Sequence, residues 1–383
     1  MKERRFATRV IHGGQRCDPA TGAVMPPVYF TSTYKRPGLD TPVEYDYGRR
    51  VNPTRQALER MLADLEGGAG AHVFASGMAA VAATAQLLQA GDHVIASANG
   101  YGGIYRLFAG LLRNAGLEFS WVDAADPAAI EAARRPRTRM LFVESPTNPL
   151  LTLVDLRAAA RWCRRHGVLF VVDNTFLTPC FQRPLELGAD VVVHSTTKYL
   201  NGHSDSLGGA VICADAALAE RIGFIQNTAG AILSAMDSYL VLRGIKTLEI
   251  RMRQHALGAA ALARRLDKHR KVRRVHYPGL ASHPQRRLAR RQTHGAGGIV
   301  TVDLGSRARA RRFLESLEVF TLAESLGGVE SLAAHPATMT HGSLPAAERR
   351  RIGVSDGLVR LSVGIEDTAD IVRDVENALR RVR

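Results

Sequence analysis

The sequence predicts an α/β fold, in which a large domain with a mainly parallel sheet is followed by a smaller α+β domain. Between about residues 58 and 215, short apolar runs rich in β-branched residues alternate with helical stretches, which is typical of a parallel sheet covered by helices. From about residue 245 the alternation ends, and a long arginine-rich helical stretch precedes mixed strands and helices. With 383 residues and 46% apolar composition, the chain is long enough for two domains.

Three segments follow from this pattern. Residues 1–60 lack long periodic runs and are rich in Gly, Pro, Thr and Tyr, so we expect an extended arm that is ordered by contact with a neighbouring subunit. Residues 61–244 should form the α/β domain, and residues 245–383 the C-terminal α+β domain.

Apolar runs and helical periods predict the individual elements. In the α/β domain, strands are expected at residues 71–76, 93–97, 117–123, 139–145, 167–173, 189–194 and 208–214. Helices in the same domain are expected at 58–66, before a closing glycine, at 77–91 and at 155–167. The C-terminal domain should contain a helix at 246–269, strands at 274–279 and 297–305, a helix at 308–317, a strand at 358–366 and a terminal helix.

Composition limits the class of protein. No apolar run approaches the roughly 20 residues that a membrane span requires, and the first residues, MKERRFATRV, contain no apolar signal core. Four scattered cysteines without a CxxC pair indicate reduced thiols in a cytoplasmic protein, with neither disulfides nor a zinc site. The histidines show no metal-ligand spacing, so no metal is expected, and we expect no membrane partner.

The net charge of +15 makes nucleic acid a candidate partner. However, the arginines are scattered through helical stretches, and the aromatic residues, at 6%, do not interleave with a basic stripe. A solvated arginine-rich surface that attracts anionic metabolites is therefore the favoured interpretation. A non-enzymatic, basic nucleic-acid-binding protein on an α/β scaffold is the remote alternative.

Polar residues follow the ends of the predicted strands, where ligands bind in parallel sheets. Ser76, Gly77 and Met78 stand where a strand turns into a helix, a place that suits a phosphate; a serine N-cap with a tight turn is the simpler explanation. Tyr101, flanked by glycines, is suited to lie against a planar ligand, although for this residue taken alone a loop tyrosine is the favoured explanation. No GxGxxG or Walker motif follows a strand.

Three further strand ends strengthen the pattern. Asn148 follows one strand, and Asp173 ends a run of five apolar residues, where a buried carboxylate requires a partner such as a pyridinium nitrogen. Ser195, Thr197 and Lys198 follow the next strand, and burial there would favour a neutral, nucleophilic lysine. A phosphate anchor, a stacking ring, an aspartate and a lysine together are the groups expected around pyridoxal 5'-phosphate (PLP).

Long segments of the chain match a known family in the same order. They are YGRRVNPTR, FASGMAA, YGGIYRLF, ESPTNPLL, VVDNTF, HSTTKYLNGHSD, FTLAESLGGVESL and LVRLSVGIED. Through these segments the sequence resembles, nearly end to end, the PLP-dependent enzymes of Cys/Met metabolism, which include cystathionine γ-synthase and cystathionine γ-lyase. The resemblance implies PLP as cofactor and the aspartate aminotransferase-like fold of PLP-dependent transferases (fold type I).

The resemblance also implies roles for individual residues. Lys198 would form the Schiff base and move protons, Tyr101 would stack on the ring, and Asp173 would pair with the pyridine nitrogen. The PLP phosphate would be held by Gly77, Met78, Ser195 and Thr197 and, from the neighbouring subunit's arm, by Tyr47 and Arg49. Family members are typically tetramers built from two such dimers, so a homotetramer with shared active sites is expected.

The substrates implied by the resemblance are amino acids. Arg360 would bind the α-carboxylate in a bidentate manner, and Ser325 and Asn148 would lie near the substrate and the ring hydroxyl. Arg106 resembles a contact for the distal carboxylate, and Glu324 one for the distal amino group.

The identity of the family member depends on a few positions. Leu326 and Gly327 stand where β-lyases usually carry Trp-Gly, which argues against a cystathionine β-lyase, and Gly103 replaces the cysteine typical of methionine γ-lyases. Asp46 and Arg50 resemble the γ-synthases, in which an additional arginine would suit a succinyl carboxylate. IHGGQ and YPGLASHPQ look equally like bacterial γ-lyases.

We therefore expect a cystathionine γ-synthase, which would make cystathionine from O-succinylhomoserine and cysteine. Cystathionine γ-lyase, which would convert cystathionine to cysteine, 2-oxobutyrate and ammonia, is the alternative. An O-acetylhomoserine sulfhydrylase is a remote alternative.

Overall fold

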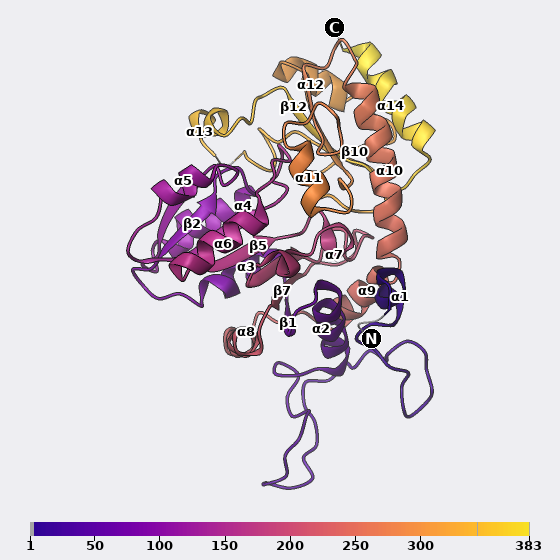
Figure 1. Cartoon of the computed structure of the whole chain (residues 1–383). Helices are drawn as coiled ribbons and strands as arrows, with labels where there is room; N and C mark the ends of the chain where they lie inside the picture. Colours follow the sequence, from indigo (N-terminus) through magenta and orange to yellow (C-terminus); the bar gives the residue numbers. More distant parts are fainter. Residues whose placement is uncertain (1–3, 343, 383) are drawn as a thin grey trace.

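A seven-stranded sheet forms the centre of the large domain in the computed structural model, which describes residues 4–342 and 344–382 (Figure 1). Its strand order is β1-β7-β6-β5-β4-β2-β3, and only β7 runs antiparallel to its neighbours. The strands are β1 (Gly70–Phe74), β2 (His93–Ser97), β3 (Glu118–Val122), β4 (Thr138–Glu144), β5 (Leu169–Asp173), β6 (Val191–Ser195) and β7 (Gly209–Cys213). The predicted α/β class and mainly parallel sheet are confirmed, and each expected strand of this domain lies within two residues of its predicted bounds.

Helices cover both faces of this sheet, which explains why its central strands are apolar on both sides. One face packs against α3 and α8, and the other against α5 and α6. The helical segments of the domain are α2 (Pro53–Glu66), α3 (Gly77–Ala85), α4 (Gly102–Tyr105), the π-helix η1 (Arg106–Leu112), α5 (Pro127–Ala132), α6 (Leu156–His166), α7 (Thr178–Phe181), the 3-10 helix η2 (Pro184–Leu187), α8 (Ala216–Ala229) and α9 (Ala235–Ile245).

The C-terminal part folds around a second sheet of five strands in the order β10-β11-β12-β9-β8. Its strands are β8 (Arg274–His276), β9 (Ile299–Asp303), β10 (Thr321–Leu322), β11 (Leu332–Ala334) and β12 (Leu358–Ser362). Its helices are α10 (Leu248–Leu266), α11 (Arg286–Gln292), α12 (Arg307–Leu314), α13 (Ala346–Arg351) and α14 (Thr368–Arg381). Apolar residues of α10, α12 and α14 form one core with β9 and β12.

One predicted helix is shorter than expected. The helix predicted at 77–91 ends at Ala85 as α3, and the following residues turn until Gly91, whose φ is 85°. Leu87 and Leu88 continue the apolar pattern, but they pack at the edge of the core under α3 and the sheet. Periodicity therefore could not show where this helix ends.

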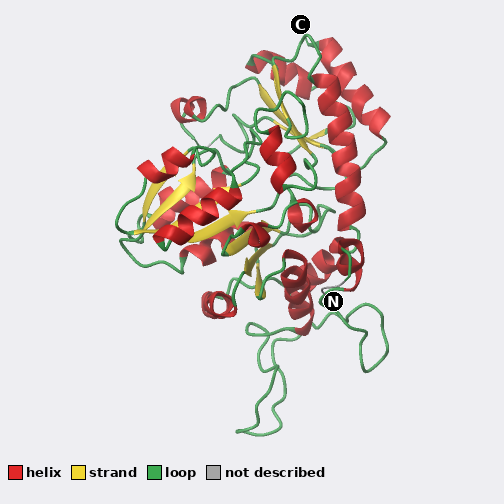
Figure 2. Ribbon diagram, viewed as in Figure 1, coloured by secondary structure: helices red, strands yellow, loops and turns green. Residues whose placement is uncertain are grey.

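The N-terminal segment is mostly irregular, as expected. Two helices border it: α1 (Phe6–His12) and α2, which begins at Pro53 after the N-cap Asn52 and packs on β1. The loops between these helices extend away from the rest of the chain (Figure 2). Val24, Phe30 and Leu39 expose their apolar side chains on these loops, and Leu39 is 94% exposed.

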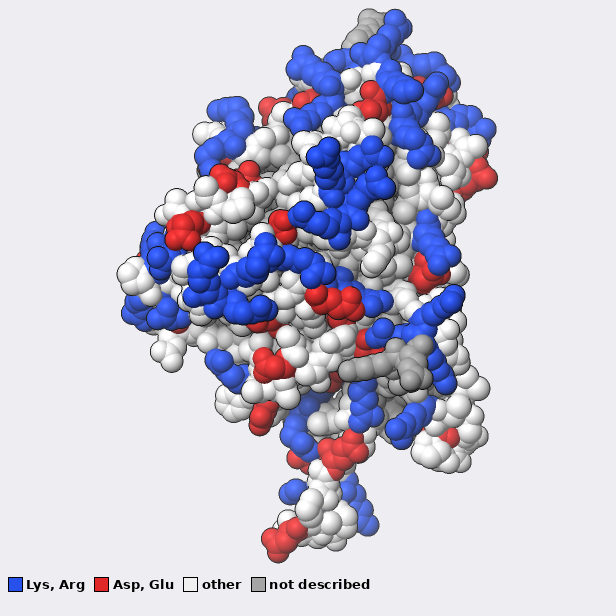
Figure 3. Space-filling view, in the orientation of Figure 1, with Lys and Arg blue, Asp and Glu red and all other residues white. Residues whose placement is uncertain are grey.

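On the face of the molecule seen in Figure 3, basic side chains are spread out rather than collected in one groove. Figure 3 shows Lys and Arg from the C-terminal part down to the arm, with Asp and Glu between them. Many pairs are local, such as Arg351 with Glu348 and Arg311 with Glu315. Among the described residues, no helix combines the length and apolar character that crossing a membrane requires.

Candidate active site

A cavity of about 340 Å³ lies beyond the carboxyl ends of the parallel strands. Its wall brings together most residues that the sequence singled out: Gly77, Met78, Tyr101, Asn148, Asp173, Ser195, Thr197, Lys198, Glu324, Ser325 and Arg360. The first eight follow strands of the large sheet, and the last three come from the C-terminal part. The site is therefore assembled from both sheets.

Lys198 lies in the turn after β6 and donates from Nζ to Ser325 Oγ at 2.7 Å. Burial, reinforced by the nearby Arg360 guanidinium and opposed by Glu324, lowers the pKa of Lys198 to about 8. The amine is therefore much closer to its neutral, nucleophilic form at physiological pH than an exposed lysine. Ser325, its acceptor, has a φ of 102°, an unusual conformation for a residue with a side chain.

The lowered pKa of Lys198 should appear in the stability of the cofactor-free protein. Between pH 8 and 10.5 the unfolded lysine holds its proton while the folded one has lost it, so Lys198 makes stability rise with pH across this window. Relative to Lys198→Met, the wild type should be less stable by on the order of 3 kcal/mol below pH 8. Urea unfolding of both apo forms at pH 7 and 10.5 checks this, and a difference independent of pH would contradict it.

Asp173 ends β5 beside Glu144, its register partner at the end of β4. Burial raises the pKa of Asp173, while hydrogen bonds from Thr175 and the nearby His194 oppose the rise; the Thr175 N–H donates to Asp173 Oδ1 at 2.9 Å. Burial and the Asp173 carboxylate hold the pKa of Glu144 well above its ordinary value. The site therefore opposes ionisation of both carboxyl groups, and that of Glu144 more strongly.

The start of α3 forms a cradle against β6. Ser76 caps the helix by accepting from the Ala79 N–H at 3.1 Å, and the first turn of a helix presents further N–H groups to an anion. A Cβ on Gly77 would lie 2.9 Å from Ser195 Cβ, so only glycine allows this approach without displacement. The Gly208 N–H donates to Thr197 Oγ1 at 3.0 Å and thereby fixes this hydroxyl group.

Tyr101 precedes α4 and is 37% exposed at the cavity. Its ring lies over Gly103, because a Cβ at that position would come within 2.4 Å of Tyr101 Cε1 and 3.0 Å of Met78 Sδ. The absence of a side chain at position 103 is thus a steric condition for this ring position.

We expect Gly103→Ala to displace the Tyr101 ring and to lower kcat by about tenfold to a hundredfold, as misplacement of a reacting group commonly does. Gly110→Ala is a matched control, because a Cβ at Gly110 meets nothing within 4 Å. Steady-state kinetics of both variants check this. Equal kcat values for the two would show that the ring position does not depend on Gly103.

Arg360, in β12, is 2% exposed and lines the cavity. It donates from Nη1 to Asn148 Oδ1 at 3.1 Å and from Nη2 to the Ser325 carbonyl at 2.6 Å, while its buried Nε has no partner. Burial lowers the pKa of Arg360 to about 10, which leaves it positively charged at neutral pH. Among the described residues no carboxylate forms an ion pair with Arg360, so the site is prepared for an external anion.

Five of the predicted site residues lie outside this cavity. Tyr47 and Arg49 lie at the base of the arm, where the Arg49 guanidinium stacks 5.2 Å from the Tyr47 ring centroid. Arg50 pairs with Asp46 at 2.6 Å on the exposed arm. Arg106 begins the π-helix η1 with an exposed side chain.

Several lining residues were not predicted from the sequence: Glu144, Thr175 and Thr340. Ser76, whose position the sequence suggested for a phosphate or an N-cap, also lines the cavity. Glu144 follows a buried run as Asp173 does, and this shared pattern could have identified it. Thr175 supports two neighbours, since it donates to Asp173 and its Oγ1 accepts from the Ser195 N–H at 2.9 Å.

The residues of the cavity fit PLP. Asp173, which forms no ion pair with any described residue, suits a pyridinium nitrogen, and the Gly77 cradle with two hydroxyls suits a phosphate. Lys198 supplies an amine with a lowered pKa in the same space. Among the described residues, no cluster of His, Cys, Asp and Glu has the arrangement of a metal site.

A model of the family "Cys/Met metabolism PLP-dependent enzyme" matches residues 7–380 of the chain. The protein belongs to this family. Its cofactor is PLP, and its fold is that of the PLP-dependent cystathionine lyases and synthases. The resemblance seen in the sequence is confirmed.

Similar relatives carry three different activities in their names. Cystathionine beta-lyase of Coxiella burnetii is 52% identical over 99% of this chain and 98% of its own, and cystathionine gamma-lyase of Bacillus subtilis is 47% identical over 98% and 99%. Cystathionine gamma-synthase of Mycobacterium bovis is 48% identical over 97% and 96%. A solved cystathionine gamma synthase from Xanthomonas oryzae pv. oryzae matches with a TM-score of 0.97 at 44% identity, over 99% of this chain and 98% of that one. The family members thus share one architecture for several reactions.

Proposed function

We propose that this protein catalyses trans-sulfuration at the γ-carbon of homoserine-derived amino acids, as a cystathionine γ-synthase. The observation that carries the proposal is the pair of opposite charges, Arg360 and Glu324, that line the cavity with Lys198. No carboxylate in the described part of the chain pairs with the buried Arg360 cation, and Glu324 is an exposed carboxylate at the cavity; both charges act on the Lys198 amine. Cystathionine, the product of the proposed reaction, has a carboxylate that matches Arg360 and a distal amino group, contributed by cysteine, that matches Glu324.

The chain's own residues divide the work of the reaction. Arg360 binds the α-carboxylate and thereby orients Cα towards Lys198, whose neutral amine takes the α-proton. Tyr101 lies at the same cavity with a phenol that can move a second proton. PLP supplies the electron sink that makes proton removal from carbon feasible. In the proposed reaction the cysteine thiol bonds to the γ-carbon and succinate leaves.

Cystathionine γ-lyase activity is a second candidate, and the arm favours it. Arg50 was expected to bind a succinyl carboxylate, but it is already paired with Asp46 at 2.6 Å and donates to the Glu44 carbonyl. A charge that is offset in this way has less to offer an additional carboxylate. In this reaction water would complete the cleavage, giving cysteine, 2-oxobutyrate and ammonia. The β-lyase names among the relatives add cleavage to homocysteine and pyruvate as a third outcome to measure.

Product analysis with purified, PLP-saturated enzyme tests the proposal. O-succinylhomoserine is supplied with and without cysteine, and cystathionine is supplied alone. Rapid formation of cystathionine from the pair, with little cleavage of cystathionine, is the expected result. Release of cysteine and 2-oxobutyrate from cystathionine would assign the γ-lyase reaction, and release of homocysteine and pyruvate the β-lyase reaction. Either cleavage as the dominant reaction would overturn the synthase proposal.

We also propose that two copies of the chain share their active sites, in a homotetramer of two such dimers. Tyr47 and Arg49 lie outside the cavity of their own chain, on an arm with exposed apolar residues. A second copy would cover that apolar surface and receive Tyr47 and Arg49 at its PLP phosphate. Sedimentation equilibrium checks the tetramer, and a monomer at micromolar concentration would contradict it.

A further inference from the structure

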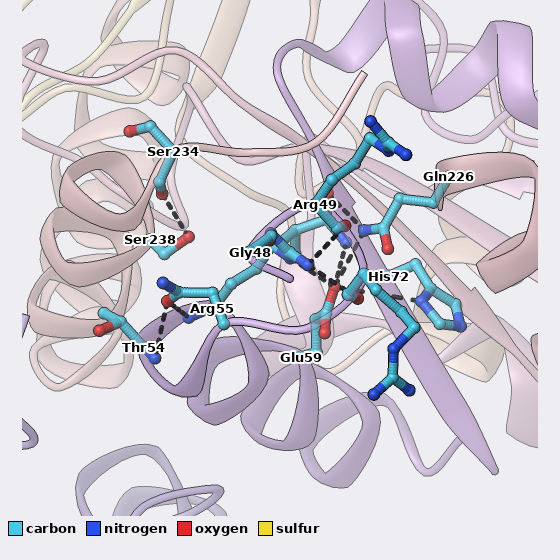
Figure 4. Close-up of polar contacts among 12 residues, drawn as sticks. Gly48, Arg49, Thr54, Arg55, Glu59, His72, Gln226, Ser234 and Ser238 are labelled. Atoms are coloured by element: carbon cyan, nitrogen blue, oxygen red, sulfur yellow. Dashed lines mark hydrogen bonds and ion pairs between the residues drawn. The ribbon is translucent and has the colours of Figure 1, made fainter. Parts of the chain in front are cut away.

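One buried arginine holds the base of the arm, defined here as residues 47–50. Arg55 of α2 is 2% exposed and donates from Nη1 to the Gly48 carbonyl at 2.8 Å. Its Nη2 donates to the carbonyls of Arg49 and Arg50, both at 3.0 Å (Figure 4). A planar guanidinium can serve these three acceptors at once, which a lysine ammonium on a flexible chain cannot reproduce. The backbone on both sides of Arg49 is thereby fixed.

Glu59, one turn further along α2, connects this arginine to the sheet. Its Oε1 lies 3.7 Å from Arg55 Nε and accepts from the Val73 N–H at 3.1 Å and from Gln226 Nε2 at 3.0 Å. The Gln226 amide also donates to the Val73 carbonyl at 2.8 Å. Figure 4 shows Arg55, Glu59 and Gln226 meeting in one group of polar contacts. Burial lowers the pKa of Arg55, and the nearby Glu59 carboxylate opposes this shift.

These contacts connect the base of the arm with strand β1, and each of these two parts leads to residues that we expect to bind a PLP phosphate. Val73 lies in β1, whose end leads directly into Ser76 and Gly77 at the start of α3. Arg55 holds the base of the arm, from which Tyr47 and Arg49 project as a stacked pair. Asn227, next to Gln226 in α8, accepts from Arg49 Nε at 3.4 Å. The arm base is thus positioned against the same strand that leads into the chain's own cradle.

We propose that Arg55 and Glu59 are positioning residues that set Tyr47 and Arg49 for the PLP phosphate in the partner subunit's cavity. The proposal rests on the shared active site proposed above. A subunit with an altered Arg55 would therefore weaken PLP binding in its partner and leave its own cavity intact. A role confined to the folding of α2 would affect the cavity of the altered subunit at least as strongly.

Mixed oligomers separate these two effects. A tagged minor chain that retains Lys198 is co-expressed with a large excess of an untagged chain carrying Lys198→Ala, so that only the tagged chain's cavity shows the visible absorbance of bound PLP. In the first mixture the tagged chain carries Arg55→Lys and receives unaltered arms. In the second the tagged chain is wild type and the excess chain also carries Arg55→Lys. The reference mixture lacks Arg55→Lys.

The readout is the dissociation constant of PLP, measured by absorbance titration of cofactor-free oligomers. We expect a rise of about tenfold in the second mixture, corresponding to the loss of roughly one hydrogen bond's contribution. The first mixture should stay at the reference value. Equal weakening in both mixtures, or weakening only in the first, would overturn the proposal. Glu59→Gln in the excess chain provides a second variant that keeps an acceptor for Val73 but loses the charge.

Two controls identify the source of a negative result. Arg60→Lys in the excess chain is the matched substitution on the same helix, since Arg60 forms an exposed ion pair with Glu44 at 3.4 Å. This substitution should leave the dissociation constant of PLP unchanged. Arg49→Gln in the excess chain should weaken binding if the arm enters the partner's cavity. If Arg49→Gln weakens PLP binding and Arg55→Lys does not, the positioning role of Arg55 is wrong. If neither substitution weakens PLP binding, the proposed shared active site is wrong as well. Because no reaction is measured, neither outcome bears on trans-sulfuration.

Discussion

Lys198→Ala is expected to abolish the visible absorbance of protein-bound PLP and to lower turnover at least about 10³-fold. Lys198 is the lysine of the cavity: it donates to Ser325 and lies under the influence of Arg360 and Glu324. Burial lowers its pKa to about 8, so it can act both as nucleophile toward the cofactor carbonyl and as base toward Cα. Alanine leaves no group at this position for either task.

Absorbance spectra and product assays of the purified variant measure both effects. Lys268→Ala, at an exposed position in the C-terminal part, is a suitable control for loss of a lysine charge. Circular dichroism and the oligomeric state should remain those of the wild type, because removal of a buried, partly desolvated amine does not destabilise the fold. Full turnover by Lys198→Ala would refute the assignment of the site.

The strand ends could be predicted because each apolar run stops at a polar residue. Asp173 and Ser195 end their strands as expected, so their approach across β5 and β6 followed from a parallel sheet alone. The contact between Arg360 and Asn148 joins residues 212 positions apart, and no local pattern predicts such a pair. The sequence also does not predict the φ of 102° at Ser325, because serine rarely adopts this backbone conformation.

The arm shows the other limit of sequence-based prediction. Its irregular composition indicated dependence on another chain, but the clamp that orders its base consists of backbone carbonyls, which any residue provides. Arg55 therefore looked like one more basic residue of the irregular arm, outside the helix predicted at 58–66. Likewise, Asp46 and Arg50 were predicted as substrate contacts because these residue types resemble those of the γ-synthases at the same positions. The structure shows that the two side chains form an ion pair with each other, which depends on the backbone conformation of the arm and not on the residue types alone. Whether this pair also meets substrate stays a prediction.

Asp173→Asn is expected to lower turnover by about 10²–10³-fold, the typical cost of removing a fixed charge from an active site. Asparagine retains the shape and can still accept from the Thr175 N–H. It cannot offer a negative charge to a pyridinium nitrogen, which would then lose its proton and accept electrons less readily. The bound cofactor should therefore also show an altered absorbance spectrum, measured by pH titration of the holoenzyme.

Glu144→Gln is the matched control, because the structure offers two carboxyl groups side by side. Glu144 is the register partner of Asp173 on the neighbouring strand and lines the same cavity. Its Oε2 accepts from the Asn148 N–H at 3.3 Å, an acceptor role that the glutamine carbonyl preserves. Burial and the Asp173 carboxylate raise the pKa of Glu144, so the uncharged glutamine amide replaces a carboxyl group whose ionisation the site already opposes. Turnover should stay within about threefold of the wild type; a loss as large as that of Asp173→Asn would mean that Glu144, not Asp173, carries the negative charge.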